Sequence, residues 1–188
     1  MTEPGGKDRG RALVIAVSGL HGSGRSTHAK RLADAFGLRY VSSGTIFRQM
    51  AEERGLTLEE MSRLTESEPE LDKLIDERAR EESRKGGVVV DATLSGWMCV
   101  EPDLRIFLTT SVDARVRRIA EREGVSPEDA RKETEARAES ERERFKAYYG
   151  IDIDDLSIYD VVLNTDLFDP DGTARILKRV VEEYCSGR

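Results

Sequence analysis

Five short apolar segments are spaced along the chain and predict the strands of one sheet. The first, ALVIAVSG at residues 12–19, is a nearly continuous apolar run, which is typical of a strand buried on both faces. Similar runs predict strands at 38–43, 87–92, 104–110 and 159–165. Because helical patterns separate these strands, the expected fold is an α/β fold with a parallel five-stranded sheet flanked by helices.

Amphipathic stretches with cap and stop signals predict the helices between the strands. The expected helices cover 26–36, 45–85 with breaks near Gly55 and Pro69, 112–123, a long polar stretch over about 126–150, and 172–184. Ligands of such sheets bind where the strands end at their carboxyl termini. We therefore expect the functional residues at or just after the strand ends, except those on the long polar helix.

The composition predicts one compact globular unit. The chain has 188 residues, of which 36% are charged and 38% hydrophobic. We expect a flexible leader over residues 1–11, with no secretory signal, and a single domain over 12–185. The apolar runs are too short to span a bilayer, so no membrane association is expected.

The charge distribution argues against a nucleic-acid partner. The formal net charge is −7, and the most cationic region, residues 111–146, contains as many acidic as basic side chains. Cys99 and Cys185 are far apart and the chain has two histidines, so no zinc site is expected. This cysteine usage fits a reducing, cytoplasmic setting. We expect a monomer that acts on small molecules.

The segment GLHGSGRST, residues 19–27, follows the first strand and resembles a phosphate-binding loop. The pattern is Gly, four residues, Gly, Lys, then Ser or Thr, and Gly19, Gly24 and Ser26 fit it. Glycine and serine let backbone N–H groups converge on phosphate, and the helix that follows adds the positive end of its dipole. The expected ATP-binding residues are Gly19, Leu20, His21, Gly22, Ser23, Gly24, Arg25, Ser26 and Thr27.

One position of this loop departs from the pattern, because Arg25 stands where lysine is usual. Arginine also supplies positive charge to phosphate, but its planar fork is larger than an ammonium, so we expect a working site with altered geometry. A glycine turn without ligand is the plain alternative. A dinucleotide site is disfavoured, since Thr27 stands where that motif needs its third glycine. For His21 and His28 a surface role is favoured over a catalytic one.

Together with the stretch SSGTIFRQM at residues 42–50, the loop makes the chain resemble the nucleoside monophosphate kinases. The resemblance implies a P-loop kinase fold with a helical acceptor-binding insert at about 44–85 and a short helical lid at about 126–150. It also implies that Ser43 and Gly44 belong to the acceptor site, and that Arg48 holds the phosphate of the acceptor monophosphate.

The chain is more closely similar to the archaeal type of cytidylate kinase. The blocks FRQMAEERG, YYGIDI and SIYDVVLNT occur in that order, and the resemblance runs from Val14 to about Val181. It implies transfer of the γ-phosphoryl group of ATP to CMP or dCMP, with Mg²⁺ as the metal ion. Ser26 is expected to ligate that ion through its hydroxyl.

The segment after the third predicted strand departs from this family. Many relatives have Glu-Gly-Arg, whose arginine touches phosphate, whereas this chain has Asp91, Ala92 and Thr93. Asp91 is placed where an acid can hold Mg²⁺ through water. The missing arginine predicts weaker acceptor binding unless another arginine compensates.

Two interpretations fit the long polar helix. Arg137 and Arg144 lie seven residues apart and share one face with Glu141, while Arg142 points away. The family resemblance implies that Arg137 and Arg144 close over the phosphates and stabilise the transition state. A solvated helix with ion pairs such as Arg137–Glu141 explains the same spacing.

Two rival functions remain beside a cytidylate kinase. One is a P-loop kinase for another small acceptor, such as AMP, UMP or a sugar. The other is a nucleotide-binding module that has lost catalysis, for which Arg25 and Thr93 are the support.

Overall fold

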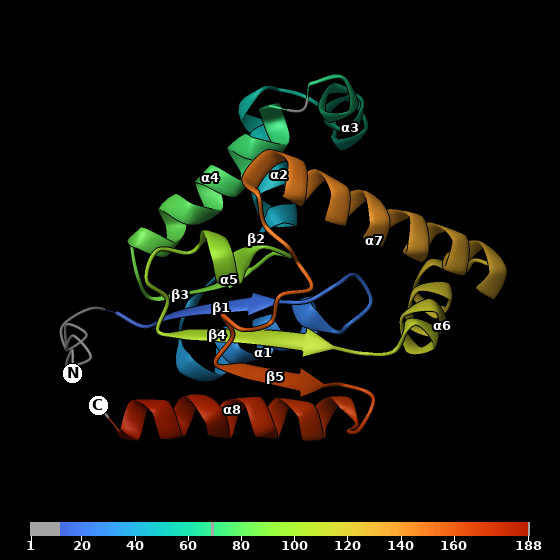
Figure 1. Ribbon diagram of the computed structural model, residues 1–188. Coiled ribbons are helices and arrows are strands. Elements are labelled where there is room, and N and C mark those ends of the chain that lie inside the picture. Colours follow the sequence, from blue (N-terminus) through green and yellow to red (C-terminus); the bar gives the residue numbers. More distant parts are fainter. Residues whose placement is uncertain (1–11, 69, 188) are drawn as a thin grey trace.

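The computed structural model describes residues 12–68 and 70–187 and shows five parallel strands in one sheet (Figure 1). The strands are β1 Val14–Ser18, β2 Arg39–Ser42, β3 Val88–Asp91, β4 Leu104–Thr109 and β5 Val161–Asn164. They lie in the order β2-β3-β1-β4-β5, and every neighbouring pair is parallel. The expected strands and fold class are therefore confirmed, whereas the expected leader, residues 1–11, lies outside the described residues.

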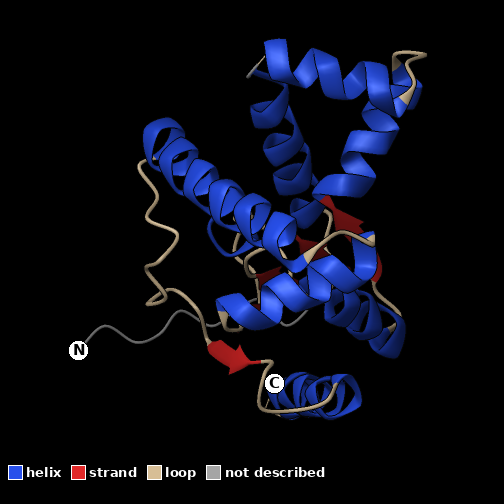
Figure 2. Ribbon diagram, turned by 90° about the vertical axis from the view of Figure 1, so that its right-hand side faces the viewer, coloured by secondary structure: helices blue, strands red, loops and turns tan. Residues whose placement is uncertain are grey.

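Helices connect the strands and cover both sides of the sheet (Figures 1 and 2). They are α1 Arg25–Phe36, α2 Ser43–Glu53, α3 Leu58–Ser67, α4 Glu70–Arg84, α5 Ser95–Met98, α6 Val112–Glu123, α7 Pro127–Tyr149 and α8 Pro170–Ser186. The helical interval expected at 45–85 divides into α2, α3 and α4, with breaks where they were predicted. The four-residue helix α5 was not predicted, because one turn is too short to show a periodic pattern.

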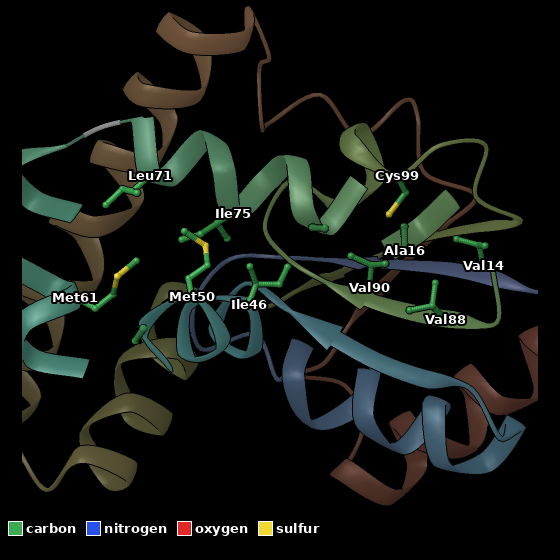
Figure 3. Close-up of a cluster of buried hydrophobic side chains, with 12 residues drawn as sticks. Val14, Ala16, Ile46, Met50, Met61, Leu71, Ile75, Val88, Val90 and Cys99 are labelled. Carbon is green, nitrogen blue, oxygen red and sulfur yellow. The ribbon is translucent and has the colours of Figure 1, made fainter. Parts of the chain in front are cut away.

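Alternate residues of the central strand face two separate cores, which explains its continuous apolar pattern. Val14 and Ala16 of β1 pack into a cluster with side chains of α2, α3 and α4, part of which Figure 3 shows. Ile15 and Val17 face the opposite side, where α1 and α8 contribute apolar side chains. All five residues of β1 are buried, so the loop that follows it starts from a rigid base.

The polar helix α7 connects two distant parts of the molecule. It packs against α6 at its beginning, and in Figure 1 it runs from α6 toward the helices α2 to α4. At its far end the Tyr149 hydroxyl donates a hydrogen bond of 2.8 Å to Asp76 Oδ2 on α4. Helix α7 thus connects α6 with α4.

Candidate active site

The loop after β1 has the backbone that a phosphate site requires. Gly19, Gly22 and Gly24 have φ angles of 146°, 84° and 85°, a region that side-chain-bearing residues rarely adopt. A Cβ at Gly19 would lie 2.5 Å from the Leu108 carbonyl oxygen of β4, so this position has no room for a side chain. Gly24 caps α1 without a side-chain hydrogen bond, and the first turn holds no acidic residue. The N–H groups of that turn are therefore available to an anion.

A cavity of about 350 Å³ opens over this loop. Residues 20–27 all line it, whereas Gly19 is buried at the base of the loop and does not. The other walls come from α6, from the residues after β5 and from the start of α8. The structure therefore brings eight of the nine expected loop residues around one cavity large enough for part of a nucleotide.

Two arginines of α6 line the same cavity and were missed by the sequence reasoning. Arg118 donates to Thr165 Oγ1 at 2.9 Å and to the Thr165 carbonyl at 3.0 Å, and it reaches the Gly22 carbonyl at 3.3 Å. Arg122 Nη2 lies 2.9 Å from His21 Nε2. The signal was present in the block RRIAEREG, where the two arginines are one helical turn apart after β4.

A third arginine of α6, Arg115, ties this helix to the phosphate loop. Its side chain is buried, and its Nε donates to the His21 carbonyl oxygen at 2.7 Å. Burial lowers the pKa of its guanidinium, while the nearby Glu141 carboxylate raises it. A contact between residues 94 positions apart gives no signal in the sequence.

The two histidines are neutral at neutral pH. Burial, with the nearby Arg137 and Arg122, lowers the pKa of His21 to about 4. Burial also lowers the pKa of His28 to about 4. The expectation of a surface position was wrong for His28, which is 4% exposed because it shares the inner face of α1 with Leu32. Neither residue carries a positive charge to the loop.

Arg25 is held by groups on two neighbouring strand ends. Its Nε donates to Asp91 Oδ1 in a short ion pair. Its Nη1 donates to the Gly19 carbonyl at 2.6 Å and to Thr93 Oγ1 at 3.0 Å. The guanidinium therefore extends from the loop after β1 to the residues at the end of β3.

Asp91 is buried between two hydrogen-bond donors. Besides the bond from Arg25, its Oδ2 accepts a bond of 2.5 Å from the Tyr40 hydroxyl. Burial and the Asp91 carboxylate raise the pKa of Tyr40, and the Ser42 and Ser26 hydroxyls nearby partly offset this rise. Asp91 and Ser26 thus both lie near the Tyr40 hydroxyl.

Ser26 and Asp91 fit a magnesium ion that is bound mainly by substrate phosphates and water. Mg²⁺ in such sites keeps several waters and uses one or two protein oxygens beside the substrate phosphates. Ser26 presents its hydroxyl on an exposed residue, and each Asp91 oxygen keeps a second lone pair for water. Within residues 12–68 and 70–187 no three His, Cys, Asp or Glu side chains gather into a ready-made metal site, so the substrate would supply most ligands.

A second cavity, of about 180 Å³, lies on the other side of Arg25. Ser43 at the start of α2 and Thr93 after β3 form one wall, and Arg137 and Arg144 of α7 form another. Arg137 also makes the expected ion pair with Glu141, at 3.2 Å. The expected ion pair is therefore present, whereas the closing of Arg137 and Arg144 over phosphates stays a prediction.

Not all of the expected acceptor residues reach this cavity. Arg48 and Gly44 are exposed on α2 and do not line it, and Arg48 Nη1 lies 3.7 Å from where a Cβ of Gly44 would be. Among the described residues Arg48 makes no hydrogen bond or ion pair. Arg142 points away, as expected, and pairs with Glu139 and Asp154.

Comparison with known proteins agrees with this geometry. A sequence model of the cytidylate kinase-like family matches residues 14–167, most of the chain.

The chain belongs to the cytidylate kinase-like family.

Relatives named cytidylate kinase share high similarity over nearly their whole length. The protein from Pyrococcus horikoshii is 44% identical over 90% of this chain and 88% of its own. The one from Halobacterium salinarum is 44% identical over 94% and 93%, and that from Methanothrix thermoacetophila is 46% identical over 87% and 95%. The resemblance to the archaeal type of this family is thereby confirmed.

Solved structures confirm the fold alone. An uncharacterized protein from Eubacterium ventriosum superposes with a TM-score of 0.68 at 17% identity, covering 90% of this chain and 98% of its own. Shikimate kinase from Bacteroides thetaiotaomicron gives a TM-score of 0.59 at 15% identity, with the same coverage. Within the described residues, no helix is both long and apolar enough to cross a membrane.

Proposed function

We propose that this chain is a cytidylate kinase, which transfers the γ-phosphoryl group of ATP to CMP or dCMP and releases ADP with CDP or dCDP. The observation that carries the proposal is the pair of cavities that meet at Arg25, one over a glycine loop and one lined by arginines. A module that only binds a nucleotide needs the first cavity and not the second. The proposal that the acceptor base is cytosine comes from the relatives named cytidylate kinase.

The donor triphosphate would lie over the glycine loop. Its phosphates would accept hydrogen bonds from the backbone N–H groups of residues 20–27, with the helix dipole of α1 behind them. Ser26 would ligate magnesium, and Asp91 would hold one of its waters. A metal ion held there would supply positive charge to offset the negative charge that develops on the phosphates. Arg118 and Arg122 also line this cavity.

The acceptor monophosphate would lie between α2 and α7. Ser43, Gly44 and Arg48 belong to the first turns of α2, and Arg137 and Arg144 come from α7. Residues 44–85 would form the acceptor-binding insert and residues 126–150 the lid. Arg48 lies outside the second cavity, so binding of the acceptor requires its long side chain to turn toward Ser43.

The chemistry needs position and charge more than acid or base. The attacking oxygen is already an anion of the acceptor phosphate, so a strong general base is unnecessary and no covalent intermediate is expected. Arg137 and Arg144 would stabilise the charge that spreads over the transferred group, and α7 would keep water away from it. The protein would work as a monomer, since both cavities belong to one chain.

The proposal is tested by measuring ADP formation from ATP and Mg²⁺ with CMP, dCMP, UMP, AMP and GMP in parallel. We expect turnover with CMP or dCMP to exceed that with every other monophosphate at least about tenfold. Preference for another monophosphate would support the rival kinase. The variant Arg48→Ala then distinguishes a kinase from a non-catalytic nucleotide-binding module. A kinase should lose turnover while its ATP affinity is unchanged. Wild-type protein that binds ATP and shows no turnover in any well would contradict the proposal.

A further inference from the structure

Arg25 is the one residue, within the described part of the chain, that lines both cavities. It belongs to the phosphate loop by position, yet its guanidinium extends to the end of β3. In the sheet, β3 lies between β1, which carries the loop, and β2, which leads into the acceptor insert. The charged group is therefore displaced from the donor side toward the acceptor side.

The guanidinium is fixed by three of its five N–H groups. Nε–H is used by Asp91, and the two N–H groups of Nη1 are used by Gly19 and Thr93. Nη2 makes no hydrogen bond within residues 12–68 and 70–187. The side chain is 19% exposed. Nη2 therefore keeps its two N–H groups for a ligand that accepts hydrogen bonds.

A lysine at this position could not do the same. Its ammonium has three N–H groups on one nitrogen atom, and the bonds to Asp91, Gly19 and Thr93 would use all of them. The planar fork separates the anchoring nitrogens from Nη2. Thr93 is part of the arrangement, because its short hydroxyl lies 3.0 Å from Nη1 and a longer side chain there would occupy the space of the guanidinium.

We propose that Arg25 is a ligand of the acceptor phosphate, and that Thr93 is its positioning residue. The two residues are joined by the hydrogen bond from Arg25 Nη1 to Thr93 Oγ1. With Arg137 and Arg144, Arg25 gives the second cavity three guanidinium groups, which suits a dianionic phosphate. The donor phosphates are left to the loop backbone. The inference rests on the proposed function, since it takes the acceptor to be a nucleoside monophosphate.

The first test is direct binding of CMP and of a non-hydrolysable ATP analogue, each measured separately by titration calorimetry. Arg25→Lys should weaken CMP binding about tenfold or more, the loss of a charge-assisted hydrogen bond, and change binding of the ATP analogue less than about threefold. Arg31→Gln, on the exposed face of the same helix, is the matched control and should leave both unchanged. Weaker ATP-analogue binding with unchanged CMP binding, or an equal loss of both, would overturn the inference.

The second test moves the charge between the two positions. Arg25→Thr alone should weaken CMP binding, and Arg25→Thr combined with Thr93→Arg should restore it to within about threefold of wild type. Thr93→Val should raise the KM for CMP with little effect on kcat, while Thr93→Ser, which keeps the hydroxyl, should behave as wild type. No restoration in the double variant, or equal behaviour of the valine and serine variants, would contradict the pairing. Wild-type protein that binds no monophosphate would instead refute the proposed function.

Discussion

At the scale of single residues, the site depends on positions where the backbone geometry requires glycine. The glycine pattern of the loop could be read from the sequence, because each glycine must adopt a backbone that other residues avoid. The partners of Arg25 could not, since Asp91 and Thr93 are 66 and 68 residues away and no local pattern encodes such contacts. The same holds for Arg118, whose hydrogen bonds join α6 to the residue after β5.

Two glycines with positive φ separate the effect of backbone strain from that of crowding. At Gly37 a Cβ would have nothing within 4 Å, whereas at Gly19 it would lie 2.5 Å from a backbone oxygen. We expect Gly37→Ala to cost about 1 kcal/mol of unfolding free energy, from strain alone. Gly19→Ala should cost at least about 2 kcal/mol more and abolish ATP binding, because the loop must shift. Urea unfolding and ATP titration measure both, and equal costs for the two variants would contradict the argument.

At the scale of elements, the periodic patterns predicted the position of an element where it is long or central in the sheet. The helix expected at 112–123 is α6 to the residue, and Ser111 caps it through its hydroxyl. The pattern of α7 predicted a helix but not its neighbours, because its buried residues are few and none is a large apolar one. Only the fold shows that this helix reaches the insert.

The contact between α7 and the insert can be tested at Tyr149. Its hydroxyl bonds to Asp76 on α4, while the hydroxyl of the neighbouring Tyr148 makes no hydrogen bond with the described residues. Tyr149→Phe should lower the unfolding free energy by about 1 kcal/mol and speed amide hydrogen exchange in the last turn of α7. Tyr148→Phe serves as the control and should change neither. Identical exchange in the two variants would show that this bond does not hold the helix.

At the scale of the whole molecule, the order of the strands places the two cavities side by side. Because β1 and β3 are neighbours, the residues after them, Arg25 and Thr93, come within hydrogen-bond distance. The sequence predicted a parallel sheet and both groups of residues at its carboxyl edge. It could not predict that one arginine joins them, since that depends on which strands are adjacent.

The central claim is that ATP and CMP bind at the same time, with their phosphates meeting at Arg25. It is tested most directly by inhibition with a bisubstrate compound, in which adenosine and cytidine are joined through five phosphates. The account predicts that this compound competes with ATP and also with CMP, and that Arg25→Lys weakens its inhibition. Competition with ATP alone would show that the second cavity is not the acceptor site and would contradict the account.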